Sequence, residues 1–290
     1  MNKPTLRLDK LDPIGLEELN GEASLLTRKD RKYVLPLALA QELVGQDGLR
    51  VLQIDGLRTF RYESVYFDTP DRISYLAAAH KRRRRFKVRT RSYLDSGLCS
   101  LEVKTRERRG LTEKHRLPYA IARRNQLTED ALDFVNGFDT IAPVSRTLRP
   151  VLTTRYSRTT LLERSSGSRI TIDTGLQCEA ADGSTVSLPD MAVVETKTSG
   201  QPCRTDRLLW TAHRRPVKIS KYCTSLAALT PGLPANKWNR VLRTSFGWIP
   251  EPARATPGCR NPDPVARLEP VDRPTVDRST WAPSLEGVGS

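Results

Sequence analysis

Polar and apolar residues alternate along residues 85–93 with a period of two, which places successive β-strand side chains on opposite faces. Phe86, Val88 and Thr90 fall on one face of this predicted strand. The other face is entirely basic: Arg85, Lys87, Arg89 and Arg91.

The alternation continues after turn signals at 95–97 and 109–110. In the second run Leu101, Val103 and Thr105 share the apolar side, and the charged side holds Glu102, Lys104 and Arg106. A third run places Lys114 and Arg116 together. The pattern therefore predicts three antiparallel strands linked by hairpins.

Similar patterns predict further strands at 24–36, 59–71, 149–163, 168–176 and 191–200. Helices are predicted from Pro36 to Gln46, at 127–138 and at 204–213, with shorter ones at 73–77 and after Lys221. An antiparallel sheet with flanking helices follows, which is an α+β arrangement.

Charge changes the interpretation of the basic face. Residues 81–91 hold eight Lys or Arg and no acid, and the chain carries a formal net charge of +15. A solvated sheet face remains the plain alternative, but such faces usually mix signs to limit repulsion between cross-strand neighbours. We favour a polyanion-binding face, for nucleic acid, nucleotide, polyphosphate or an acidic lipid surface. The run Lys81–Arg85 is interpreted equally well as a solvated loop or as a guide for a product or an acidic partner.

The rest of the composition narrows the class of protein and the kinds of site that it can contain. No run approaches the length of a membrane span, and the first residues lack the apolar core of a secretory signal, so a cytoplasmic location is expected. The five cysteines show no CxxC spacing, which argues against a zinc site or a disulfide framework. With three histidines, any metal is expected to be held by carboxylates and substrate oxygens.

Composition also suggests boundaries. Residues 1–23 are predicted to form an N-terminal arm, and 24–249 one folded domain. From Pro250 the apolar periodicity stops, and eight of the final 41 residues are proline, so 250–290 is predicted to be a disordered tail.

A series of motifs, in order and spacing, resembles the VTC domain, the polyphosphate polymerase branch of the CYTH-like triphosphate tunnel metalloenzyme superfamily. The motifs are RKDRKYVLP, SVYFDTPD, KVRTRSY, LEVKTR, TEKHR, RYSRTT, RITIDT, VVETK and VKISKY. The resemblance implies an antiparallel β-barrel of about eight strands with flanking helices, whose interior is a basic triphosphate tunnel.

It also implies roles for individual residues. The catalytic set would be Arg89, Arg91, Lys114, Lys221 and Glu195, with Glu195 also the ligand of Mn²⁺ or Mg²⁺. Other phosphate-binding residues would be Lys32, Lys104, Arg116, Tyr156, Arg158, Arg169, Lys197, Lys218 and Ser220. Asp173 and Glu102 would either assist the metal or, as we favour, pair with neighbouring arginines.

One departure bears on activity. Triphosphatases of this superfamily carry Glu-x-Glu-x-Lys on the first strand, where this chain has Arg28-Lys29-Asp30-Arg31-Lys32. Fewer carboxylates favour transfer to a phosphate acceptor over hydrolysis.

The expected function is therefore transfer of the terminal phosphoryl group of ATP to inorganic polyphosphate. The alternatives are a tripolyphosphatase or nucleoside triphosphatase, and a non-catalytic module that binds polyphosphate or inositol phosphate. A membrane-protein partner is conceivable, whereas nucleic acid is disfavoured because the prominent aromatic residues fall at strand ends.

Overall fold

The structure is a computed structural model that describes residues 6–22, 29–106 and 112–249. The predicted tail, the second hairpin turn at 109–110 and Arg28 lie outside the described residues. One compact unit spans Met1–Glu251. No helix in the described part of the chain combines the length and apolar character needed to cross a membrane.

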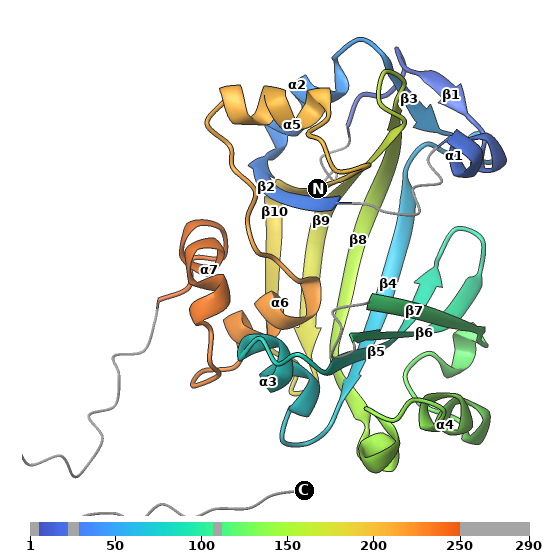
Figure 1. Cartoon of the computed structure of the whole chain (residues 1–290), viewed down its shortest axis with the longest axis vertical. Coiled ribbons are helices and arrows are strands. Elements are labelled where there is room, and N and C mark those ends of the chain that lie inside the picture. The colour runs from blue at the N-terminus through green and yellow to red at the C-terminus, as the bar shows by residue number, and fades with distance from the viewer. Residues whose placement is uncertain (1–5, 23–28, 107–111, 250–290) are drawn as a thin grey trace, which may run out of the picture. The chain divides into compact units, whose positions relative to one another are not determined.

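The centre of the fold is one long antiparallel sheet (Figure 1). Its strand order is β2-β10-β9-β8-β4-β5-β6-β7. The bounds are β2 Lys29–Pro36, β4 Phe60–Asp68, β5 Arg85–Tyr93, β6 Leu98–Arg106, β7 Thr112–Pro118, β8 Arg149–Glu163, β9 Ser168–Ala180 and β10 Thr185–Thr198. A short parallel pair, β1 Asp12–Ile14 with β3 Leu49–Leu52, extends the sheet beside β8.

The sheet curls into a tunnel-like barrel. Burial and the charges of Lys87 and, from β2, Lys32 lower the pKa of the Lys104 ammonium on β6, so the inward charges of β6 and β2 act on one another. Among the described residues no ladder joins β2 to β7, the two ends of the strand path. The α+β fold expected from the sequence is confirmed.

Helices pack on both faces of the sheet. The helices are α1 Leu16–Glu22, α2 Leu37–Val44, α3 Ile73–Ala79, α4 Glu129–Asn136, α5 Arg204–Thr211, α6 Lys221–Leu229 and α7 Asn239–Ser245. Apolar strand residues such as Leu35 and Ile172 form one core with α2 and α5, and Val88 and Val103 form a second with α4. These strands therefore bury their apolar faces outward, under helices, which turns their charged faces inward.

Helix α6 packs on the inner face of the sheet. Its Tyr222 and Leu226 join one cluster with Tyr66, Tyr156 and Val193, which occupy inward strand positions. This apolar contact brings Lys221, the first residue of α6, to Asp173 on β9.

The predicted elements largely agree with the observed ones. The three basic strands form β5, β6 and β7, in the expected hairpin order. Gly97, at the first turn, has a φ of 69°, in the left-handed region where glycine is favoured. Thr128 adopts the extended backbone of an N-cap, but its side chain makes no capping bond and instead accepts one from Tyr119.

The sequence did not reveal the short strands β1 and β3 or the helix α7. Residues 6–22, part of the predicted N-terminal arm, form β1 and α1 and pack against the sheet through Ile14 and Leu19, each 1% exposed. The hairpin of β9 and β10 is also longer than predicted, with an irregularity between Leu188 and Ala192 that interrupts the alternation.

Asp206 joins α5 to the sheet. It is fully buried and accepts hydrogen bonds from Arg31, the Tyr33 hydroxyl, the Thr196 hydroxyl and the Cys203 amide. Removing one partner of such a buried ion pair leaves a charge without compensation.

We therefore expect Asp206→Ala to lower the free energy of unfolding by about 3–5 kcal/mol, measured by urea denaturation. The matched control is Asp190→Ala, an exposed position on β10, which should stay within about 0.5 kcal/mol of wild type. Equal effects of the two substitutions would contradict this role for Asp206.

Candidate phosphate-binding interior

Strand register places the inward cations in rows that cross β5, β6 and β7. Lys87 lies opposite Lys104, and Lys104 lies opposite Lys114. We call these three residues the lysine row. Like charges directly opposite each other destabilise an antiparallel pair, so three in a row indicate a surface that an anion would stabilise.

The lysine row is only partly withdrawn from solvent: Lys87 is half-buried, whereas Lys104 and Lys114 remain exposed. Burial lowers the pKa of the Lys114 ammonium to about 8, although the charge of Glu102 and a hydrogen bond to it act in the opposite direction. The pKa of Lys104 is lowered in the same sense. Both side chains are therefore easier to deprotonate than a lysine with its usual pKa.

The next row is partly neutralised by one acid. Glu102, 2% exposed, accepts from Arg89 at 2.8 and 2.6 Å, from Lys114 at 2.6 Å and from Arg116 at 3.2 Å. Burial alone would raise the pKa of this carboxyl, but the charges of Arg89, Arg91 and Lys114 hold it well below its usual range. Glu102 is thus an anion shared by three strands.

Asp173 on β9 plays a similar part on the opposite wall. It accepts two bonds from Arg158 at 2.6 and 2.8 Å and a further one from Lys221, the first residue of α6. Arg158 and Lys221 also lie over the ring of Tyr156. The expected pairing of Asp173 and Glu102 with arginines is confirmed.

Glu195 is less tightly held. Its carboxylate oxygens lie 3.3 Å from the Lys32 ammonium and 3.5 Å from that of Lys197. Burial raises its pKa, but the charges of Lys32 and Lys197 outweigh that effect and bring it to about 2, so the carboxylate is ionised.

The donors present allow a metal only together with a substrate. Within the described ranges no group of three or more His, Cys, Asp or Glu side chains could hold an ion. Glu195 fits Mg²⁺ or Mn²⁺ when phosphate oxygens complete the coordination, and Asp30 lies on the same face of the neighbouring strand β2. The metal site stays a prediction.

Several inward side chains have buried polar atoms without partners among the described residues. Among them are Nε of Arg91, whose residue is 9% exposed, and the hydroxyl of Tyr156. Arg91 lies over the ring of Tyr62 and directly between Ser64 and Ser100, whose hydroxyls are also buried and unpartnered. Unsatisfied groups of this kind are costly, and a bound oxyanion or water would satisfy them.

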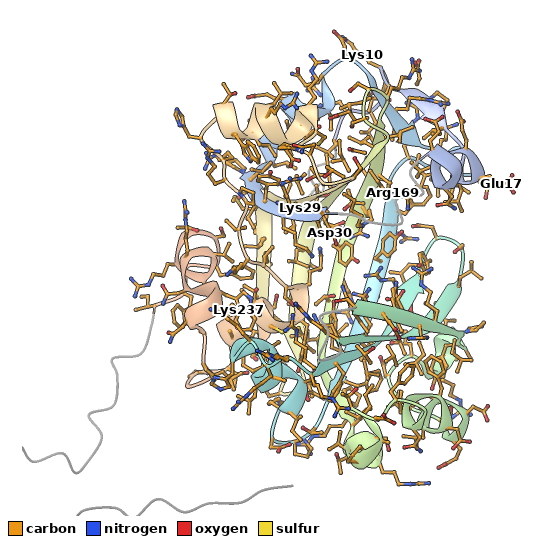
Figure 2. The ribbon with its side chains drawn as sticks, in the orientation of Figure 1. Lys10, Glu17, Lys29, Asp30, Arg169 and Lys237 are labelled. Atoms are coloured by element: carbon orange, nitrogen blue, oxygen red, sulfur yellow. The ribbon has the colours of Figure 1, made fainter. Side chains whose placement is uncertain are left out.

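The segment before α6 supplies further polar groups. The backbone of Val217 bonds to that of Lys32, which holds this segment beside β2. Ser220 caps α6 and its hydroxyl accepts from Lys87 at 3.1 Å. Lys218 is exposed, and its charge helps to lower the pKa of Lys237. Figure 2 places Lys237 on the side of the structure near α3 and α6.

Arg169 lies apart from the lysine row. Its guanidinium donates to the Leu19 carbonyl at 3.2 Å and to the Asn20 side chain at 3.0 Å, so it contacts α1 (Figure 2). It remains on the inward face of β9, opposite Lys197.

The structure thus brings most predicted site residues to one face. Those on strands are Lys32, Arg89, Arg91, Lys104, Lys114, Arg116, Tyr156, Arg158, Arg169, Glu195 and Lys197. Lys218, Ser220 and Lys221 come from the segment before α6 and its first turn. Their roles with phosphate stay predictions. The family motifs did not single out Lys87, although strand alternation alone places it on this face.

Comparison with known proteins gives one strong match. A family model described as the VTC domain matches residues 27–230. A search of curated proteins finds no significant match.

Solved structures give weaker likenesses. The putative adenylyl cyclase HpAC1 from Hippeastrum, described as having a dominant triphosphatase activity, shares 18% identity at a TM-score of 0.43, over 67% of this chain and 93% of that one. The PH1819 protein from Pyrococcus horikoshii OT3 shares 12% identity at a TM-score of 0.39, over the same shares of the two chains. At these scores the likenesses support no conclusion about activity.

The family match spans most of the chain, and it includes every strand of the long sheet from β2 to β10. The protein therefore belongs to the VTC domain family.

Proposed function

We propose that this VTC domain is a polyphosphate polymerase that transfers the terminal phosphoryl group of ATP to a growing polyphosphate chain. The observation that carries the proposal is the lysine row, in which Lys104 is also influenced by the charge of Lys32 on β2. A linear chain of phosphates offers negative charge at regular intervals, which suits cations arranged along a row better than a single compact anion does.

The reaction would be positional and electrostatic. A terminal oxygen of the polyphosphate chain would form a bond to the γ-phosphorus of ATP as the bond from that phosphorus to the β,γ-bridging oxygen breaks, and ADP would leave. Arg89, Arg91, Lys114 and Lys221 would neutralise the charge that spreads over the transferring oxygens.

A divalent cation, when bound, would screen the phosphate oxygens, and Glu195 would hold it. Asp173 and Glu102 are engaged by cations, which leaves few carboxylates to orient a hydrolytic water. This supports transfer over hydrolysis.

The direct test incubates the purified protein with ATP and Mn²⁺ or Mg²⁺, with and without a short polyphosphate primer. We expect ADP in equal amount to the phosphate incorporated into chains, resolved by gel electrophoresis. Release of free phosphate without formation of polyphosphate chains would show a hydrolase and contradict the polymerase.

A non-catalytic binding module would give a third result, which binding and turnover measurements together distinguish. Tripolyphosphate binding that persists in Glu195→Ala, without turnover in the wild type under any metal, would support a binding module. Competition by single-stranded RNA as strong as that by polyphosphate would contradict phosphate-chain selectivity.

Arg91→Gln tests the unpartnered cation. Because charge-assisted bonds contribute about 1.5–3 kcal/mol, we expect tripolyphosphate affinity to fall by at least about tenfold in calorimetry. The free energy of unfolding should hold or rise, since the substitution removes a buried charge. Arg243→Gln, at an exposed position on α7, is the control for lost charge. Equal losses of affinity in both variants would contradict a specific role.

Lys114 predicts a pH dependence. Its ammonium has a pKa lowered to about 8, so it is charged below that pH and loses its charge above it. Tripolyphosphate affinity should therefore fall between pH 7 and 9. Lys114→Arg is the control, because arginine stays charged and the ligand titrates equally in both experiments. Identical pH profiles for the two proteins would rule out Lys114 as the titrating group.

A further inference from the structure

Glu102 is an acid in a face that is expected to bind anions, and simple electrostatics would count it against phosphate binding. We propose that Glu102 is a positioning residue that holds Arg89, Lys114 and Arg116 in the arrangement that receives the phosphate chain. The proposal rests on the proposed function for its ligand class, and it assigns Glu102 a role that neither a metal ligand nor a substrate contact would have.

The geometry supports this role. The two oxygens divide their partners: one accepts both bonds from Arg89, and the other accepts from Lys114 and Arg116. These partners come from the strands on either side of β6, so one carboxylate fixes side chains of three neighbouring strands. Tyr66 holds Arg89 from the other side, because its hydroxyl accepts from that guanidinium at 3.2 Å.

Long cationic side chains lose conformational freedom when they bind a ligand, and this loss weakens binding. A buried anion that already orders them reduces the loss. Glu102 is 2% exposed, so it is fixed by its surroundings. Glu102 accepts one hydrogen bond from the Lys114 ammonium, whose remaining N–H groups can donate to a phosphate.

Glu102 also keeps Lys114 charged. The charged groups that face Lys114 from the strands packed beside it are mostly cations: Arg89 and Arg91 on β5, Lys104 and Glu102 on β6, and Arg116 on β7 itself. Glu102 is the acid in this set, and its charge and hydrogen bond oppose the loss of the proton that burial favours. Without it, Lys114 would deprotonate at lower pH.

The chain offers a matched control. Glu63 on β4 is also buried, at 6% exposed, and bridges Arg124 at 2.6 Å and Arg155 at 2.7 Å. Its neighbours Tyr62 and Ser64 occupy the inward positions, so Glu63 lies on the outward face. A stabilising role alone predicts the same consequences for Glu63→Gln and Glu102→Gln, whereas a positioning role does not.

The experiment measures tripolyphosphate binding to the full chain by calorimetry from pH 6 to 9, together with urea unfolding. For Glu102→Gln we expect at least about a tenfold loss of affinity at pH 7, and a midpoint of the pH profile lower by about one pH unit or more. Glu63→Gln should lose stability comparably, yet keep affinity within about threefold and the midpoint unchanged.

Glu102→Asp provides a second variant, also informative where the Gln variant fails to fold. It keeps the charge but shortens the reach by one methylene group. The midpoint should therefore stay near that of the wild type, while affinity falls to an intermediate value.

Two outcomes overturn the inference. Tighter or equal binding by Glu102→Gln with an unshifted midpoint would mean that the carboxylate only repels phosphate, and unchanged binding by Glu102→Asp would exclude positioning. Failure of the proposed function is distinguishable, because a wild type that binds no tripolyphosphate overturns both proposals. A wild type that binds but does not polymerise leaves the role of Glu102 open to this same measurement and overturns polymerisation alone.

Discussion

Repulsion among closely spaced cations on the inward face is the constraint on which the structure depends. Two unit charges about 5 Å apart repel by roughly 3 kcal/mol at an effective dielectric constant of about 20. The inward face of β5, β6 and β7 places lysines opposite lysines and arginine opposite arginine. Such a face is stable only if other contacts in the fold offset the repulsion. The remaining positive charge gives the domain an affinity for anions.

The fold holds this face in two ways. Apolar residues on the outward side of the strands pack under α2, α5 and α4, so the sheet is stabilised by contacts that do not involve the charges. Inside, Glu102, Asp173 and Glu195 each join two or more cations from different strands or from α6. This partial neutralisation leaves Arg91 and the lysine row available to a ligand.

Sequence periodicity predicted a large part of this arrangement. Alternation of period two puts Arg89, Lys104 and Lys114 each on the polar side of its strand, and burial of the apolar sides together places the three on one face. The family motifs then identified the strands as walls of one interior. What they could not supply is the partner of each charge, which depends on register between strands distant in sequence. The ion pairs of Glu102 and the packing of α6 on the inner face depend on such contacts. The contact of Arg169 with α1 could not be predicted either, because no sequence pattern near Arg169 indicates it.

The central claim is that the inward face, which keeps an excess of positive charge, is the binding site for a phosphate chain. A crystal structure of the domain grown with tripolyphosphate tests it most directly. The account predicts phosphate oxygens within hydrogen-bond distance of Lys87, Lys104, Lys114 and Arg91, with Glu102 still bonded to Arg89. Tripolyphosphate bound only on the outer surface, with the lysine row free of ligand, would contradict it.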